Sequence, residues 1–72
     1  MHLDKLIQVV KSRRESLQVT QELLADLSGV GLRTLKQFEG GKGNPTLNTL
    51  QKLADALGLE VTLKIKELNT DL

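Results

Sequence analysis

Apolar residues recur at intervals of three and four along most of the chain, which is the period of helices that bury one face. The pattern predicts a first helix over residues 3–14, with an apolar stripe formed by Leu3, Leu6, Ile7 and Val10. A later stripe predicts a helix that begins after Thr46 and ends before Gly58, with its apolar positions at Leu47, Leu50, Leu53, Ala54 and Leu57. Both segments are therefore expected to pack on a shared core.

The stretch between these segments, residues 20–39, predicts two short helices joined by a tight turn. Thr20 precedes the first of them as a candidate N-cap, because its hydroxyl can accept a hydrogen bond from an unpaired backbone N–H. Gly29 stands where a chain that leaves a helix often takes a positive φ, which glycine tolerates best. The apolar spacing places three residues on the inner face of the first helix, namely Leu23, Leu24 and Leu27. The second helix is expected to bury Leu35 and Phe38 and to direct outward Leu32, Arg33, Lys36 and Gln37.

The period changes after Gly58, because residues 59–66 alternate strictly between apolar and polar side chains. This alternation predicts a half-buried strand whose apolar positions are Leu59, Val61, Leu63 and Ile65. The sequence contains no second strand pattern, and a lone strand leaves its backbone N–H and C=O groups unpaired. We therefore expect a homodimer in which the strands of two copies pair across a two-fold axis. Residues 1–66 would then form one domain, and residues 67–72 a polar tail.

A specific combination of one polar, two small and four apolar residues spans the two short helices, at Gln21, Leu24, Ala25, Gly29, Val30, Leu35 and Phe38. This combination resembles the helix-turn-helix of the lambdoid phage repressor and Cro family, also called Xre-type regulators, and the likeness extends over residues 10–58. It implies a mainly α fold of four to five helices that binds double-stranded DNA. The added C-terminal strand looks like the HipB-type antitoxins of this family. The alternative is a plain helical hairpin with no role in nucleic-acid binding.

A helix-turn-helix places its second helix in the major groove of DNA, with base edges near the start of that helix. Arg33 is the strongest candidate reader, since its guanidinium can donate two hydrogen bonds to guanine, and Gln37 can address adenine one turn later. The resemblance also places Leu32 at the bases and Gln21 at the edge of the groove. Leu32 would contact a thymine methyl group or be an exposed leucine without a role. The candidates for phosphate contacts are Thr20, Thr34, Lys36, Lys42 and Asn44.

The resemblance further implies an ion pair between Arg14 and Glu39, which have the spacing of the family's pair. Such a pair would tie the first helix to the recognition helix and neutralise most of the charge of Glu39. The alternative is two unrelated surface charges. The formal net charge of +1 says little about DNA, but the only acidic residue between Asp26 and Asp55 is Glu39. The same region includes the basic residues Arg33, Lys36 and Lys42.

The composition argues against several other classes of protein. The chain has no cysteine and a single histidine, His2, so neither a metal site nor a cofactor is expected. An enzyme is the least favoured class, because nucleophile–histidine pairs and glycine-rich phosphate loops are also missing. Phe38 is the only aromatic residue and is expected to be buried, which leaves no stacking platform for RNA. No apolar run approaches the length of a membrane span, so a cytoplasmic protein is expected.

Two functional hypotheses remain. The first is a sequence-specific repressor that acts as a dimer on an inverted-repeat operator. In a narrower form of this hypothesis, the protein is the antitoxin and autorepressor of a HipBA-like module and has a HipA-like toxin as its partner. The second is a protein-interaction module that has lost DNA binding, which the near-neutral charge and Leu32 favour.

Overall fold

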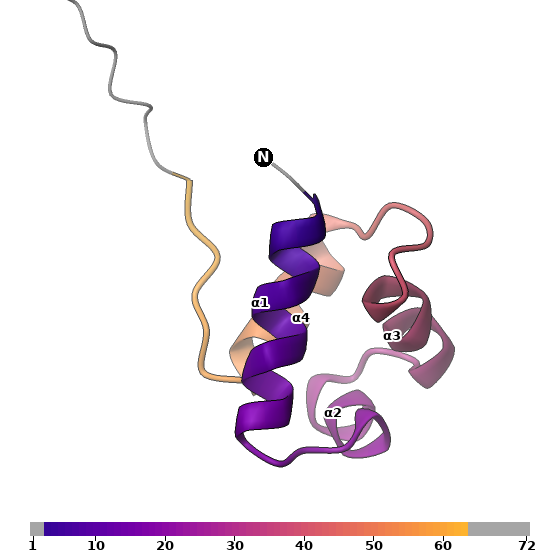
Figure 1. The fold of residues 1–72 in the computed structure, drawn as a ribbon, viewed down its shortest axis with the longest axis vertical. Coiled ribbons are helices and arrows are strands. Elements are labelled where there is room, and N and C mark those ends of the chain that lie inside the picture. Colours follow the sequence, from indigo (N-terminus) through magenta and orange to yellow (C-terminus); the bar gives the residue numbers. More distant parts are fainter. Residues whose placement is uncertain (1–2, 64–72) are drawn as a thin grey trace, which may run out of the picture.

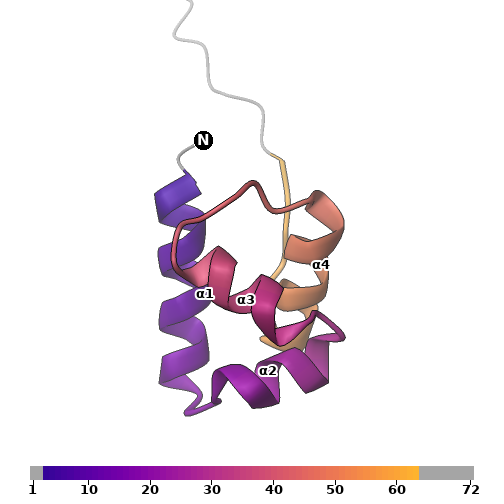
Figure 2. The ribbon, with the colours of Figure 1, turned by 90° about the vertical axis from the view of Figure 1, so that its right-hand side faces the viewer.

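A computed structural model describes residues 3–63, and this part of the chain contains four helices (Figure 1). They are α1 (Leu3–Ser16), α2 (Gln21–Ser28), α3 (Leu32–Glu39) and α4 (Leu47–Ala56). Figure 2 shows α3 in front, between α1 and α4, with α2 crossing below it. The predicted mainly α fold is thereby confirmed. Residues 1–2, which include His2, and residues 64–72, which include the predicted polar tail 67–72, lie outside the described part.

The two predicted threonine caps are confirmed. Thr20 precedes α2, and its Oγ1 accepts a hydrogen bond of 3.1 Å from the backbone N–H of Leu23. Thr46 precedes α4 in the same way, and its Oγ1 accepts a bond of 3.0 Å from the N–H of Thr49. Each threonine satisfies an N–H that has no partner within its own helix. The caps fix where α2 and α4 begin.

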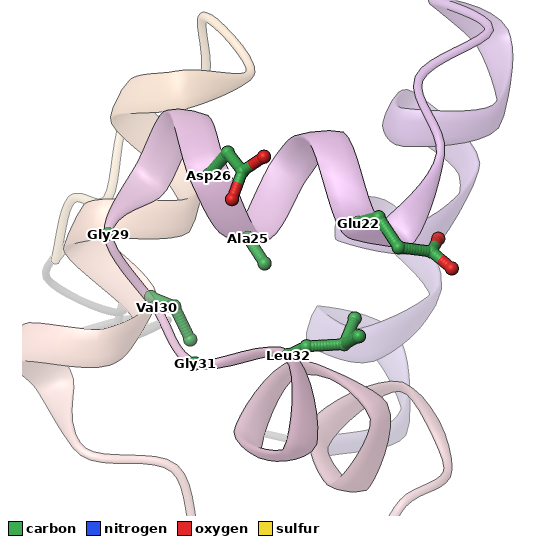
Figure 3. Close-up of a pocket in the computed structure, with 7 residues that line it drawn as sticks. All are labelled: Glu22, Ala25, Asp26, Gly29, Val30, Gly31 and Leu32. Atoms are coloured by element: carbon green, nitrogen blue, oxygen red, sulfur yellow. The ribbon is translucent and has the colours of Figure 1, made fainter.

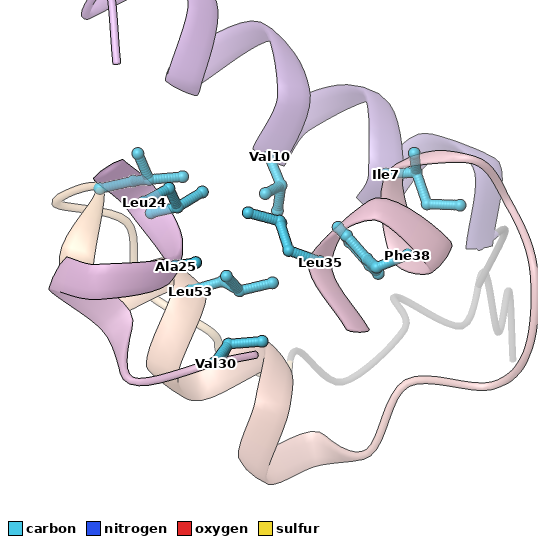
Figure 4. Close-up of a cluster of buried hydrophobic side chains, with 9 residues drawn as sticks. Ile7, Val10, Leu24, Ala25, Val30, Leu35, Phe38 and Leu53 are labelled. Carbon is cyan, nitrogen blue, oxygen red and sulfur yellow. The ribbon is translucent and has the colours of Figure 1, made fainter. Parts of the chain in front are cut away.

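All four helices contribute to one hydrophobic core (Figure 4). Its centre is formed by side chains that are fully shielded from solvent, Leu24 of α2, Leu35 of α3 and Leu53 of α4, together with Leu57. The remaining buried apolar side chains are Ile7, Val10, Ala25, Val30, Phe38 and Ala54. Because α3 buries one face here, its opposite face is left at the surface.

Three leucines that were expected on inner helix faces are at the surface instead. Leu23 and Leu27 of α2 are 45% and 61% exposed, and Leu47 of α4 is 68% exposed. Consecutive residues of a helix point about 100° apart, so Leu23 and Leu27 lie more than about 100° from the centre of the buried face of α2. That face is centred on the buried Leu24 and the small Ala25 (Figure 4). Leu47 is the first residue of α4 and therefore lies at the margin of the core.

The predicted strand is not present in its described part, residues 59–63. The chain leaves α4 through Gly58, which has a φ of 70°, and the N–H of Leu59 still bonds to the carbonyl of Ala54. Leu59 packs against the core and Val61 is half-buried, whereas Leu63 is exposed. A strand requires a neighbouring strand, and residues 3–63 of one chain supply none. Residues 64–66, including Ile65, lie outside the described part.

Gly29→Ala should test the sharp turn between α2 and α3. The φ of Gly29 is +75°, so a side chain there is expected to lower the free energy of unfolding by about 1 kcal/mol. Denaturant unfolding followed by circular dichroism measures this loss.

The matched control is Gly31→Ala, since Gly31 has a φ of −60° and the new Cβ would meet nothing closer than Thr34 Oγ1 at 3.9 Å. Alanine is less favourable than glycine at this N-cap of α3, but it also makes the unfolded chain less flexible, so the net change in stability should be less than roughly 0.5 kcal/mol. Equal losses of unfolding free energy in the two variants would show that the positive φ of Gly29 does not cause the loss in Gly29→Ala.

Candidate nucleic-acid interface

The face of α3 that points away from the core is polar. Leu35 and Phe38 are buried on the inner side, and the amphipathic spacing of the eight-residue helix leaves the other side free. The exposed side chains on that free side are Arg33, Thr34, Lys36 and Gln37. Four of the predicted DNA-contacting residues therefore share one accessible side of α3, the helix that lies in front in Figure 2.

Leu32 does not lie where it was expected. It is half-buried and packs against the core, so the prediction that it points outward with Arg33 is wrong. Its side chain forms part of the wall of an open hollow of about 450 Å³ between α2 and the start of α3 (Figure 3). The hollow is lined by Glu22, Ala25, Asp26, Gly29, Val30, Gly31 and Leu32. Only part of Leu32 is therefore free to meet a ligand.

A smaller hollow of about 80 Å³ lies between α3 and the loop that follows it. Four predicted contact residues gather around it, two from α3 and two from the loop, namely Thr34, Gln37, Lys42 and Asn44. Phe38 and Pro45 supply its apolar walls, and Gly43 completes it. Residues that were assigned to bases and to phosphates are thus brought side by side. Lys36 and Thr20 do not line this hollow.

The Arg14–Glu39 ion pair is present, and it has a two-pronged geometry. Arg14 Nε donates to Glu39 Oε2 at 2.8 Å, and Arg14 Nη2 donates to Glu39 Oε1 at 3.0 Å. The side chains are only 11% and 3% exposed. The hydrogen bond to Glu39 raises the pKa of Arg14, against the opposing effect of burial. Arg14 Nη1 also donates to the carbonyl of Val19 at 2.9 Å, which ties the α1–α2 turn to the pair.

The pair changes the charge of the α3 face. Glu39 is the only acidic residue of α3, and Arg14 compensates its charge inside the protein. The accessible charges on α3 and its following loop are therefore the positive ones of Arg33, Lys36 and Lys42. A locally positive surface attracts phosphate groups even on a protein of near-neutral net charge.

Gln21 takes a role that the sequence did not reveal. It was expected at the edge of the DNA groove, and it is half-buried at the first position of α2. Its Nε2 donates a hydrogen bond of 3.0 Å to Glu39 Oε1, so the Arg14–Glu39 pair extends to a third helix. The start of α2 and the end of α3 are 18 residues apart in sequence. Sequence spacing alone gives no signal for this contact.

The polar groups of this network are satisfied. Within residues 3–63, every buried side-chain nitrogen and oxygen atom has a hydrogen-bond partner. The same part of the chain contains no cluster of three or more potential metal-ligating side chains. None of its helices combines the length and the apolar character that crossing a membrane requires.

Comparison with known proteins gives a match to a helix-turn-helix family and similarity to two proteins that are named as repressors. Residues 10–64 match the helix-turn-helix family. The cryptic phage CTXphi transcriptional repressor RstR of Vibrio cholerae serotype O1 is 35% identical over 57 residues, which cover 79% of this chain and 51% of that protein. The immunity repressor protein of Bacillus phage phi105 is 33% identical over 60 residues, which cover 83% of this chain and 42% of that protein. The matched region thus spans about half the length of these relatives, or less.

The ion pair predicts a characteristic pattern of stabilities. Glu39→Leu alone leaves the buried Arg14 without its partner and should cost about 3 kcal/mol of unfolding free energy or more. The double variant Arg14→Met with Glu39→Leu should be more stable than Glu39→Leu alone, because two apolar side chains then fill the site.

Denaturant unfolding of the wild type, the two single variants and the double variant closes a thermodynamic cycle. Additive losses would contradict a direct interaction between the two residues.

Proposed function

The chain belongs to the helix-turn-helix family, and on that basis we propose that it is a sequence-specific DNA-binding transcriptional repressor. The observation that carries the proposal is the free face of α3, which combines exposed Arg33 and Gln37 with the basic Lys36 and Lys42 nearby. The two relatives are themselves named as repressors, one transcriptional and one of immunity. This face is what a major-groove reader requires, because it offers hydrogen-bond donors for bases and positive charge for phosphates.

In this proposal Arg33 and Gln37 read bases. Arg33 donates two hydrogen bonds to guanine O6 and N7, and Gln37 pairs with adenine N6 and N7. The two residues are four positions apart on one helix, so they lie on the same side and reach successive base pairs. Gln21 contributes at the edge of the groove. The accessible part of Leu32 is available for apolar contact with a thymine methyl group.

The phosphate contacts come from the surroundings of α3. Lys42 and Asn44 lie beside Gln37 and Thr34 around the small hollow, where a strand of DNA backbone would pass. Lys36 adds a positive charge on α3 itself. Thr20 lies at the start of α2, where free backbone N–H groups favour anions. These contacts set the orientation of the protein on DNA without reading its sequence.

The proposal includes a dimer. Residues 60–63 leave α4 without backbone hydrogen bonds to the rest of residues 3–63, and their apolar positions alternate with polar ones. Pairing Leu59, Val61, Leu63 and Ile65 with the same segment of a second copy would satisfy this backbone and cover these side chains. Two such copies would bind an inverted repeat with half-sites about 34 Å apart.

A narrower version makes the protein the antitoxin and autorepressor of a HipBA-like module. The alternation at residues 59–66 motivates it, and it predicts that a HipA-like toxin co-purifies when the native operon is expressed. Purification of the chain alone would count against it. The competing hypothesis of a protein-interaction module without DNA binding is less favoured, because Leu32, one of its two supports, is half-buried rather than exposed.

Arg33→Ala should lower affinity for the preferred operator by about 1–3 kcal/mol and relax the base preference at one position. Lys42→Ala is the matched comparison, because the loss of a phosphate contact should weaken binding to all sequences alike. It should also reduce the salt slope of log K by about 1. Fluorescence anisotropy on operator variants at several salt concentrations measures both. A uniform loss in Arg33→Ala would remove its assignment as a base reader.

Charge at the proposed dimer segment should prevent association. Val61→Asp combined with Leu63→Asp is expected to give monomers or aggregates in sedimentation experiments, because paired strands would bring the new carboxylates together. Leu47→Asp is the control: it adds a charge at another exposed leucine, in the first turn of α4, where acidic residues are favourable. An intact dimer in the double variant would reject strand pairing.

A further inference from the structure

The side-chain amide of Gln21 is bonded to the ion pair below the DNA-facing surface. Glu39 Oε1 accepts one hydrogen bond from Arg14 Nη2 and one from Gln21 Nε2, both 3.0 Å long. The contact joins the first residue of α2 to the last residue of α3. These are the two helices of the helix-turn-helix, and Gln21 as a whole is only half-buried.

The chemistry of the two groups fixes the orientation of the amide. A glutamine amide has one acceptor oxygen and two N–H donors, whereas an ionised carboxylate only accepts. Glu39 therefore binds the nitrogen end and repels the oxygen end, and a hydrogen bond to a charged acceptor is stronger than one between neutral groups. The amide oxygen and the second N–H of Gln21 are left for another partner.

We propose that Glu39 is a positioning residue for DNA recognition, which acts by holding the Gln21 amide in one orientation before DNA binds. The proposal rests on the repressor function proposed above. The groups that remain on Gln21, an acceptor oxygen and an N–H donor, match the N6 and N7 groups of adenine. A side chain that is already ordered loses less conformational entropy on binding. Gln21 thus adds a base preference, and that preference depends on Glu39.

The test uses three variants of the full chain. Gln21→Met removes the amide and keeps its length. Glu39→Gln keeps the shape of residue 39, but a neutral amide can accept or donate, so it no longer selects which end of Gln21 faces inward. The matched control is Arg14→Lys, which keeps the positive charge and loses the two-pronged pair on the same carboxylate, but changes neither partner of the Gln21–Glu39 hydrogen bond.

Binding to the selected operator and to its single-base-pair variants gives the decisive readout. Gln21→Met should weaken the preference for one base pair roughly tenfold, and Glu39→Gln should weaken the preference for the same base pair. The double variant should lose no more preference than Gln21→Met alone. Arg14→Lys should lower the melting temperature and leave this preference unchanged. If Glu39→Gln instead weakens all duplexes alike, Glu39 is only structural and the proposal is overturned.

A measurement on the wild type keeps the proposal testable if Glu39→Gln does not fold. Exchange of the side-chain amide protons, followed by NMR in the absence of DNA, should be slower for Gln21 than for Gln37. Gln37 is the internal control, because its amide makes no hydrogen bond within residues 3–63. Equal exchange would overturn the proposal.

The outcomes also separate this proposal from the function on which it rests. A wild type that selects a sequence, with a preference that Gln21→Met does not alter, overturns the positioning role and leaves the repressor function standing. A wild type that binds every duplex equally overturns both.

Discussion

The buried contact between Arg14 and Glu39 is the interaction on which the arrangement of the helices depends. It joins α1 to the end of α3, and its extensions to Val19 and Gln21 reach the α1–α2 turn and the start of α2. A buried ion pair costs desolvation, and good geometry with satisfied hydrogen bonds offsets that cost. The same contact removes the one negative charge of α3 from the surface, so fold and surface charge have a common origin.

The hydrophobic core determines which side of α3 remains available. Leu35 and Phe38 are buried where α3 packs against α1 and α2, and the small Ala25 is buried on α2. With one face buried, the other presents Arg33 and Gln37 to solvent on a rigid support. A reader of DNA needs such support, because bidentate contacts to base edges require side chains that start from fixed positions. One side of this eight-residue helix therefore packs on the core, and the opposite side is the one proposed to contact DNA.

Much of this arrangement was predictable from local chemistry. The threonine caps, the left-handed turn at Gly29 and the stripe of α1 follow from rules that involve a few neighbouring residues. The exposed positions of Leu23 and Leu27 were not predictable, because three- and four-residue spacing allows two overlapping faces, and tertiary packing selects between them. The Gln21–Glu39 contact joins residues far apart in sequence, and the proposed pairing of residues 59–66 would require a second copy of the chain. The spacing of Gln21 and Glu39 alone does not reveal their contact.

Selection of binding sites from random duplex DNA with the purified protein, at low and at moderate salt, tests the central claim most directly. In the proposed dimer, two copies of the positively charged α3 face predict enrichment of an inverted repeat whose half-sites lie about 34 Å apart. The enriched sites should contain a guanine and an adenine at positions that Arg33 and Gln37 reach. Weak binding without enrichment, lost as salt rises, would contradict the account and favour a protein-interaction module.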